Sequence, residues 1–146
     1  MPHILLSHTA VGPLIDVYVT ASLPRIKALQ AAGSPLPPTQ FCKALVDTGA
    51  SHTSIDPTIV SALGLTPTGS APIITPTTGN TPVMVPTFDV GVHVAFSNQQ
   101  FHSKNPTTVT SCVLIHQGFA VLFGRDLLGD GMMVFDGKHG VFTVSF

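Results

Sequence analysis

One stretch of the sequence constrains both the fold and the chemistry. A predicted strand over residues 41–46 ends in two aliphatic residues and leads directly into Asp47, which Thr48 and Gly49 follow. Such an aliphatic strand end is typical of a core strand, and glycine lets the backbone turn sharply or approach another segment closely. The sequence therefore places a carboxylate where a core strand opens into a cleft.

Composition narrows the class of protein. The 146 residues suit one domain, and only 9% are charged, against roughly 25% in an average soluble domain. Such low charge leaves apolar surface free for a partner chain. The formal net charge is −1 and calls for neither nucleic acid nor an anionic membrane, which need clustered lysine and arginine. A signal peptide and a long apolar run are both missing, so we expect a cytoplasmic protein with no membrane segment.

Short runs of β-branched and aliphatic residues, separated by turn residues, predict a mainly β, barrel-like domain. Residues 97–106 are polar and are expected to form a loop, and residues 76–82 form the tip of a long hairpin over 71–96. The expected strands are 14–20, 41–46, 53–55, 73–75, 83–85, 88–96, 109–115, 119–123, 132–135 and 141–146.

Residues 21–40 interrupt the strand pattern. Ser22 can cap a helix over 24–32 that Gly33 would end, and the proline-rich segment 34–38 cannot pair inside a sheet. We therefore expect residues 21–40 to form an inserted excursion on the surface.

The other expected helical segments are short. Asp56 stands at a cap position, Pro57 at the first helical position and Gly64 just past the expected end. A helical turn is expected over 125–129. Helix is thus a minor part of the predicted fold.

Cysteine and histidine do not predict a metal site. Cys42 and Cys112 fit no zinc spacing and lie in apolar runs, so both are expected to be buried thiols, with a disulfide possible if their strands are neighbours. The seven histidines lack paired-ligand spacing, and only His52, close to Asp47, is a candidate subsite residue. We expect no metal ion and no other cofactor.

Two segments resemble a known family. Residues 45–51, Leu-Val-Asp-Thr-Gly-Ala-Ser, are similar to the active-site signature of retroviral-type (retropepsin-like) aspartic proteases. Residues 121–128, Val-Leu-Phe-Gly-Arg-Asp-Leu-Leu, are similar to the second signature of that family, with a candidate flap hairpin between the two. The resemblance implies an all-β fold, a retropepsin-like closed β-barrel. It covers roughly residues 41–146 and implies a flap hairpin and one or two short helices, and we expect one domain over 1–146.

The reaction of this family needs two aspartates. Water attacks the scissile carbonyl between two carboxylates that share one proton, so that one acts as base and the other as acid. Of the seven acidic residues, all aspartates, only Asp47 is followed by Thr-Gly or Ser-Gly. The resemblance therefore implies a homodimer with one Asp47 from each copy, acting on a peptide or protein. The terminal segments 4–6 and 141–146 are candidates for a shared interface sheet.

The resemblance also implies roles for the residues around Asp47. Thr48 would hydrogen-bond across the dimer axis, and Gly49 would bring the backbone close to the substrate. Ala50 stands where pepsin-like sites have serine, whose hydroxyl would stabilise the ionised carboxylate. The absence of that hydroxyl should move the acidic limb of activity to milder pH.

Further implied roles fall on the second signature and the flap. Ala120 and Leu122 would line side-chain pockets, whereas Gly124, Arg125 and Asp126 would be structural. The flap tip would fold over an extended peptide and exclude water. The flap residues implied in substrate binding are Thr77, Thr78, Gly79 and Asn80.

Two features depart from viral members of the family. Viral proteases often carry an acidic residue where Ser51 stands, paired with the arginine that Arg125 matches. Arg125 must then find its acceptors in Asp126, in backbone carbonyls or in a partner chain. The insertion 21–40 is also unlike the viral proteins, which fits a cellular or bacterial member.

Two functions remain open on the sequence. The first is an aspartic endopeptidase that cleaves extended polypeptides. The alternative is a catalytically weak, dimeric peptide-binding or scaffold module of the same fold, because strand addition needs only backbone and pockets. Asp47 could also be a turn aspartate that bonds its own backbone. The intact Asp-Thr-Gly favours the enzyme.

Overall fold

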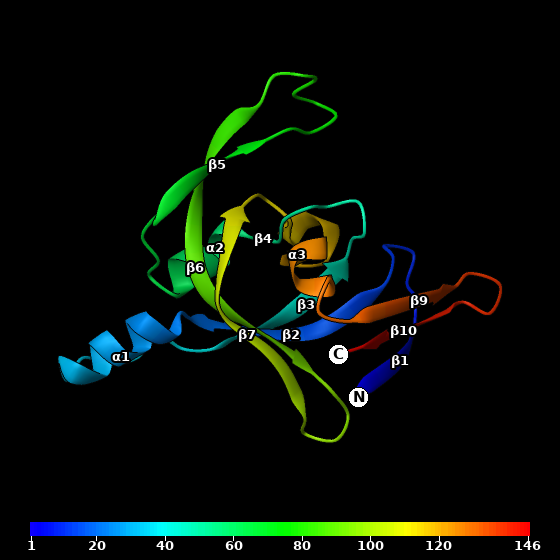
Figure 1. The fold of residues 1–146 in the computed structure, drawn as a ribbon, viewed down its shortest axis with the longest axis horizontal. Helices are drawn as coiled ribbons and strands as arrows, with labels where there is room; N and C mark the ends of the chain where they lie inside the picture. Colours follow the sequence, from blue (N-terminus) through cyan, green and yellow to red (C-terminus); the bar gives the residue numbers. More distant parts are fainter.

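Ten β-strands dominate the computed structural model, which describes residues 1–146 (Figure 1). The strands are β1 (His3–Ser7), β2 (Leu14–Ala21), β3 (Gln40–Val46), β4 (Ser54–Ile55), β5 (Gly69–Ile73), β6 (Val83–Ala95), β7 (Phe101–Ser111), β8 (Val121–Phe123), β9 (Met132–Asp136) and β10 (Val141–Ser145). The helices are α1 (Leu23–Ala31), α2 (Pro57–Ala62), α3 (Arg125–Leu128) and the 3₁₀ turn η1 (Ile115–Gln117). None of them has the length and apolar character needed to cross a membrane.

Most strands form one curved sheet that closes on itself. Its order is β2-β3-β8-β4-β7-β6-β5, and an additional pairing of β2 with β6 joins the two sides into a barrel. β3 and β8 run parallel within this barrel, whereas β5 pairs only with β6 and lies outside the closure. The predicted all-β, closed-barrel fold is confirmed.

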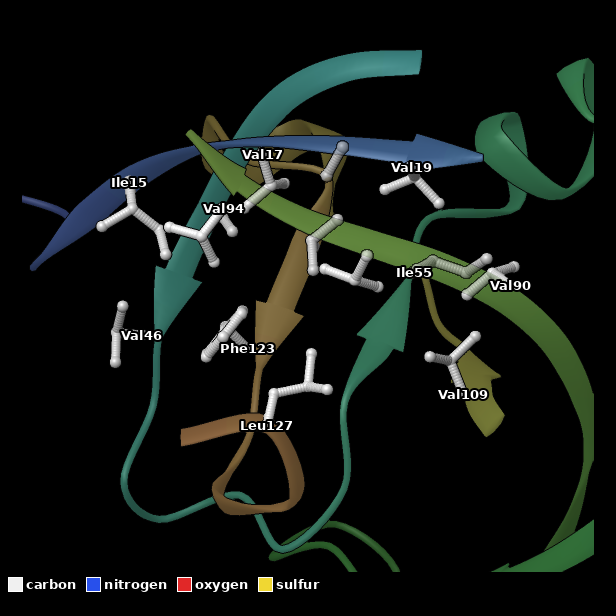
Figure 2. Packing of buried hydrophobic residues seen from close by; sticks show 14 of the residues in the cluster. Ile15, Val17, Val19, Val46, Ile55, Val90, Val94, Val109, Phe123 and Leu127 are labelled. Atoms are coloured by element: carbon white, nitrogen blue, oxygen red, sulfur yellow. The ribbon is translucent and has the colours of Figure 1, made fainter. Parts of the chain in front are cut away.

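Alternation along the strands fills the barrel. In β2 every second residue is buried, including Ile15, Val17 and Val19. Successive side chains of a strand point to opposite faces, so an alternating sequence buries one face and leaves the other outside. Val46 and Phe123, at the ends of β3 and β8, belong to the same core (Figure 2). The core therefore reaches the point where Asp47 follows.

A separate three-stranded sheet joins the two ends of the chain. β10 lies in the middle, antiparallel to both β1 and β9. Its buried residues Phe142 and Val144 belong to the barrel core, against which Ile4 and Met133 also pack. The terminal strands thus pair inside one chain, at the opposite end of the molecule from α1 (Figure 1).

The predicted helix after Ser22 is confirmed. The Ser22 hydroxyl accepts a hydrogen bond from the Arg25 N–H at 3.4 Å, and Gly33 follows the helix with a φ of 66°. A positive φ favours glycine, which explains why the helix stops there. None of the residues of α1 is buried, so the helix lies on the surface.

Asp56 ties α2 to the segment that carries η1. Its carboxylate accepts from the N–H and hydroxyl of Thr58 at 2.9 and 2.8 Å, and from the N–H groups of Leu114 and Ile115, both at 2.8 Å. Burial on its own raises the pKa of this carboxyl, but the hydrogen bonds outweigh burial and lower the pKa to about 2. Because Asp56 is only 1% exposed, these bonds form inside the protein, and they make Asp56 the joint between α2 and η1.

The polar segment 97–106 is where the sequence-based prediction fails most clearly. Only residues 97–100 form a connection, because β7 already begins at Phe101. Polar groups on this stretch pair across strands, as Ser103 does with His93 at 2.7 Å. Hydrogen-bonded pairing with β6, rather than burial, holds these residues in a strand.

Two further predictions are wrong near Cys112. The strand expected over 109–115 ends at Ser111, because Asp56 takes two of the following N–H groups out of the sheet ladder. Cys112 is exposed rather than buried, and Cys42 is half-buried. β8 and β4 lie between the strands that carry or precede these residues, so both thiols are free.

Replacing Asp56 tests the joint between α2 and η1. We expect Asp56→Ala to lower the free energy of unfolding by roughly 2–4 kcal/mol, since it removes a helix cap and leaves two backbone N–H groups without an acceptor. Because the folded-state pKa is lowered, the stabilisation is present above pH 3.8 and is lost as the pH falls toward about 2. Urea denaturation at neutral and acidic pH measures both effects.

Asp56→Asn is the matched control, since it keeps the side-chain size but cannot ionise. It should lose the pH-dependent part of the stabilisation. Equal stability of Asp56→Ala and the wild type at neutral pH would contradict this account of the joint.

Candidate active site

Asp47 stands where the two signature segments meet. β3 and β8 lie side by side, with Ala44 opposite Val121 and Val46 opposite Phe123. The Asp47 N–H continues this ladder by donating to the Phe123 carbonyl at 3.0 Å. The loop from β3 to β4 then passes the end of β8 (Figure 2). The two predicted parts of the site are therefore neighbours in space.

The turn after β3 is closed by Asp47 itself. The Gly49 N–H donates to Asp47 Oδ1 at 2.8 Å, and the Ala50 N–H donates to the Asp47 carbonyl at 3.2 Å. A Cβ on Gly49 would lie only 3.0 Å from Oδ1, so glycine suits this position. The hydrogen bond from Gly49 is the one expected if Asp47 were only a turn aspartate that bonds its own backbone. Even so, Asp47 is half-exposed and its Oδ2 has no hydrogen-bond partner in the chain.

Arg125 holds the Asp47 turn from the side of α3. Its N–H donates to the Ala50 carbonyl at 2.9 Å, and its guanidinium donates to the Thr48 carbonyl at 2.8 Å. The sequence left open which group would accept from the guanidinium of this arginine, and the backbone carbonyl of Thr48 does so. Because the two carbonyls flank Gly49, both bonds fix the turn that carries the carboxylate.

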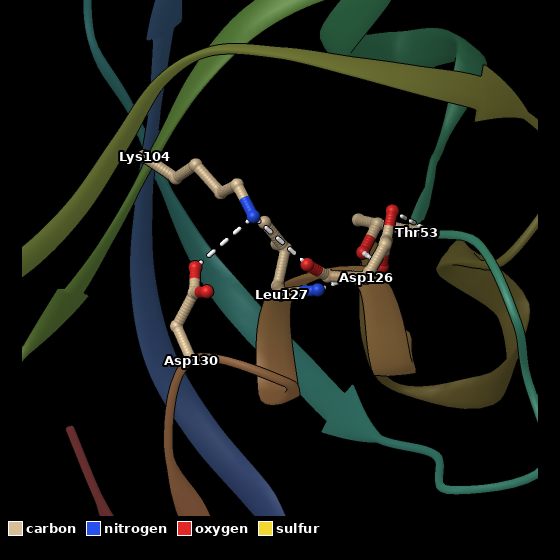
Figure 3. A network of polar contacts seen from close by, with 5 residues as sticks. All are labelled: Thr53, Lys104, Asp126, Leu127 and Asp130. Atoms are coloured by element: carbon tan, nitrogen blue, oxygen red, sulfur yellow. Dashed lines mark hydrogen bonds and ion pairs between the residues drawn. The ribbon is translucent and has the colours of Figure 1, made fainter.

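Thr53 joins the far end of the loop to α3 (Figure 3). Its N–H and hydroxyl donate to the Asp126 carboxylate at 2.9 and 2.7 Å, and the hydroxyl accepts from the Gly124 N–H at 3.1 Å. Asp126 also accepts from the Leu127 N–H at 2.9 Å. Thr53 is fully buried, so water cannot replace these bonds.

Sequence reasoning missed the role of Thr53, which was expected only to begin a strand. A polar residue at the start of a buried strand signals that a hydrogen-bond partner is needed. The sequence does not show that this partner is Asp126, 73 positions along the chain.

Gly124 is required by close packing of two backbone segments. A Cβ at this position would lie 2.7 Å from the carbonyl carbon of His52 and 2.8 Å from its oxygen. Real side chains do not tolerate such distances, so the loop can approach β8 only because residue 124 is glycine. This geometry is consistent with the structural role expected of Gly124.

The predicted flap is an extended hairpin of β5 and β6 that stands away from the barrel (Figure 1). Its tip is held by threonines, because the Thr75 N–H donates to the Thr78 hydroxyl at 2.8 Å and that hydroxyl donates back to the Thr75 carbonyl at 3.0 Å. Gly79 has a φ of 61°. The predicted flap residues Thr77, Thr78, Gly79 and Asn80 all lie in this tip.

Apolar residues near the tip were not singled out from the sequence. Ile74 is 64% exposed and Met84 is 60% exposed, one on each side of the hairpin. Of the two predicted pocket residues, Leu122 is half-buried, whereas Ala120 lies in the barrel core. Their contact with a substrate stays a prediction.

The two cysteines and the histidines are the other candidate nucleophiles and metal ligands of the chain. Burial raises the pKa of Cys42 to about 11, helped by Asp16, and partial desolvation of its thiol raises the pKa of Cys112 although the residue as a whole is exposed. Both thiols are therefore protonated near neutral pH and are weak nucleophiles. No group of three His, Cys, Asp or Glu side chains is placed to hold a metal ion. The exposed His52 belongs to no such group.

Comparison with known proteins identifies the family. Residues 39–127 match a family model described as aspartyl protease, and they make up more than half of the chain. The chain belongs to the aspartyl protease family. Its fold is similar to that of a retropepsin-like aspartic protease from Rickettsia conorii, with a TM-score of 0.56 and 15% sequence identity over 97% of this chain and 89% of that chain. In sequence, no curated protein matches it.

The segment that matches the aspartyl protease family contains the whole candidate site. It runs from just before β3 into α3, and thus includes Asp47, the flap hairpin and Arg125. α1 and the three-stranded terminal sheet lie outside it. The family resemblance expected from the two signature segments is confirmed.

Substitutions at Thr53 test the link between the Asp47 loop and α3. We expect Thr53→Val to lower the free energy of unfolding by roughly 1–3 kcal/mol, because it leaves the buried Gly124 N–H without an acceptor and removes a donor to Asp126. Urea denaturation measures the loss, and hydrogen exchange of the Gly124 amide should become faster. Thr53→Ser keeps the hydroxyl and should cost about 1 kcal/mol or less. A serine variant as unstable as the valine variant would rule out the hydroxyl as the link.

Proposed function

We propose that this aspartyl protease is an aspartic endopeptidase whose active site forms between two copies of the chain, each supplying Asp47. One observation carries the proposal. Asp47 lies at the end of a core strand and is half-exposed, and it is the one aspartate whose carboxylate no side chain of the chain binds, since its hydrogen bond comes from the Gly49 N–H of its own turn. Each of the other six aspartates is bound by at least one side chain.

These six aspartates are held inside the fold or at its surface. Asp56 and Asp126 accept the internal hydrogen bonds described above. The others are held at the surface: Asp16 by Lys43 at 2.6 Å, Asp89 by Thr108 at 2.8 Å, Asp130 by Lys104 at 3.0 Å and Asp136 by His139 at 2.6 Å. A second catalytic carboxylate therefore has to come from another Asp47, and a two-fold dimer supplies it.

The chemistry follows from two equivalent carboxylates that share one proton. The ionised Asp47 takes a proton from water as the water oxygen bonds to the scissile carbonyl carbon, and the protonated Asp47 of the other copy donates to the carbonyl oxygen. Collapse of the tetrahedral intermediate breaks the C–N bond, and a proton passes to the leaving nitrogen. The Gly49 N–H, bonded to Oδ1, orients the carboxylate for these transfers.

An extended polypeptide is the substrate that suits this site. A peptide strand can hydrogen-bond to the backbone of the flap tip at Thr77, Thr78, Gly79 and Asn80. The exposed apolar side chains of Ile74 and Met84 flank that tip and can cover apolar substrate residues. We assign Ala120 and Leu122 to the floor of the pockets, and Thr48 to the contact across the dimer axis.

The binding-module alternative makes a different use of the same fold. A module that only holds peptides needs the flap and pockets but not a free carboxylate oxygen. The unengaged Oδ2 of Asp47, on a turn fixed by Arg125, favours the endopeptidase.

A mixing experiment with Asp47→Asn tests the shared site. We expect the homodimeric variant to cleave a mixed peptide library about 10³-fold more slowly at pH 4–7, because the amide cannot act as general base. Mixed with an equal amount of wild type under free exchange, it should leave about a quarter of the activity of wild type alone at the same total protein concentration. About a quarter of the dimers are then wild-type, and heterodimers have only one Asp47 carboxylate. The control Asp89→Asn should leave activity unchanged.

The shape of the mixing curve separates the two mechanisms. A quadratic fall with the wild-type fraction supports two Asp47 per site, whereas a linear fall means that each chain acts alone. Undiminished cleavage by Asp47→Asn homodimers would leave the binding module as the better description.

Substitution of Ala50 tests how the turn sets the working pH. We expect Ala50→Ser to move the acidic limb of kcat/KM to lower pH by about one unit, because a hydroxyl bonded to the ionised dyad favours the charged form. The pH dependence of cleavage measures the shift. Ser51→Ala, one residue further along, is the control and should leave the limb in place. An unmoved limb in Ala50→Ser would show that this position does not reach the dyad.

A further inference from the structure

α3 is a helix of a single turn that holds the loop of Asp47 at two points. Arg125 donates to two carbonyls of this loop, and Asp126 accepts from Thr53. Four residues are too few for a helix that is stable on its own, and no side chain caps its first turn. The position of α3 against the barrel must therefore be fixed by contacts with other elements.

One carbonyl of α3 has no backbone donor. The other three carbonyls of the helix accept from N–H groups of the residues that follow it, which are those of Gly129, Asp130 and Gly131. The carbonyl of Asp126 is skipped, because the Asp130 N–H donates to the carbonyl three residues before it rather than four. Two buried leucines pack the helix on the core, but apolar packing cannot satisfy this carbonyl.

Lys104 of β7 supplies the missing donor (Figure 3). Its Nζ donates to the Asp126 carbonyl at 3.0 Å and to Asp130 Oδ2 at 3.0 Å. Lys104 lies opposite Val92 in the pairing of β7 with β6, so its side chain starts on the barrel face on which Val92 is buried. The lysine therefore ties α3 to the wall of the barrel that β6 and β7 form.

The bond to the helix distinguishes this lysine from Lys43. Lys43 of β3 pairs with Asp16 at 2.6 Å, much as Lys104 pairs with Asp130, but it donates to no carbonyl. Both ion pairs are partly exposed, and such pairs contribute little to stability. A specific role of Lys104 must then come from its bond to the Asp126 carbonyl.

We propose that Lys104 is a positioning residue for the Asp47 carboxylate. By binding the Asp126 carbonyl, it holds α3 where Arg125 and Asp126 can reach the loop, and the loop then keeps the carboxylate in one orientation. Proton transfer is sensitive to such orientation. Lys104 itself makes no hydrogen bond with Asp47 or with the flap. Its effect on cleavage, which rests on the proposed function, is therefore on the rate of the chemical step rather than on peptide binding.

Lys104→Met tests the position of α3 without a substrate, since methionine keeps an apolar stem and lacks the ammonium. We expect the Arg125 amide hydrogen, bonded to the Ala50 carbonyl at 2.9 Å, to exchange about 10-fold faster, because the helix can then leave the loop. The Leu114 amide, bonded to Asp56, is the internal reference and should exchange as before. Lys43→Met is the matched control and should change neither amide.

Steady-state kinetics test the consequence for cleavage. We expect Lys104→Met to lower kcat about 10-fold with KM unchanged, because the carboxylate loses its orientation while the flap and pockets are untouched. Lys104→Arg keeps a long cationic donor and should recover most of the wild-type kcat. Asp130→Asn removes the charge of the ion pair but keeps an oxygen acceptor, and it should leave kcat unchanged, as should Lys43→Met.

The outcomes separate this role from the proposed function. Wild-type exchange of the Arg125 amide in Lys104→Met overturns the positioning role, and so does equal acceleration of the Arg125 and Leu114 amides, which means a general loss of stability. Selective acceleration with an unchanged kcat overturns the effect on cleavage. Cleavage that does not depend on Asp47 overturns the proposed function and leaves the exchange result standing. Where Lys104→Met does not fold, Lys104→Ala replaces it under the same criteria.

Discussion

The parallel pairing of β3 with β8 fixes the position of the Asp47 carboxylate in this member of the aspartyl protease family. A shift of either strand by one residue would turn Val46 and Phe123 out of the core, so packing alone determines the register. That register brings the N–H of Asp47 to the carbonyl of Phe123, and β3 and β8 end at the same level. The position of the carboxylate is thus a property of the hydrophobic core.

Few charges are available in this chain, and the important ones bond to backbone. Asp56 and Asp126 accept from main-chain N–H groups, and the Arg125 guanidinium donates to the main-chain carbonyl of Thr48. Such bonds need no second charge and satisfy groups that loops would otherwise leave unpaired. Ion pairs such as Asp16 with Lys43 lie at the surface, where they contribute little to stability. A sequence with 9% charged residues therefore holds its loops by placing single charges at junctions.

Sequence reasoning succeeded where the information is local or carried by the family motif. Alternation located β2, the cap residues located α1 and α2, and the motif located Asp47. It failed where a distant partner decides the outcome. The polar start of β7 is a strand because β6 lies beside it, and the run after Ser111 leaves the sheet because Asp56 takes its N–H groups. The role of Thr53 depends on Asp126, which no local pattern connects to it.

The bonds from Arg125 to the carbonyls of Thr48 and Ala50 lie entirely within one chain. The loop that carries Asp47 is therefore ordered when the chain folds, and the entropy lost in ordering it is part of the folding free energy. In the proposed dimer, two copies that meet would not have to order this loop again, so they would associate as preformed bodies. If the hydrogen bond from Arg125 to Thr48 were lost, the loop would be ordered only when two copies meet. The entropy loss would then weaken association in the proposed dimer, although no residue of the contact surface had changed.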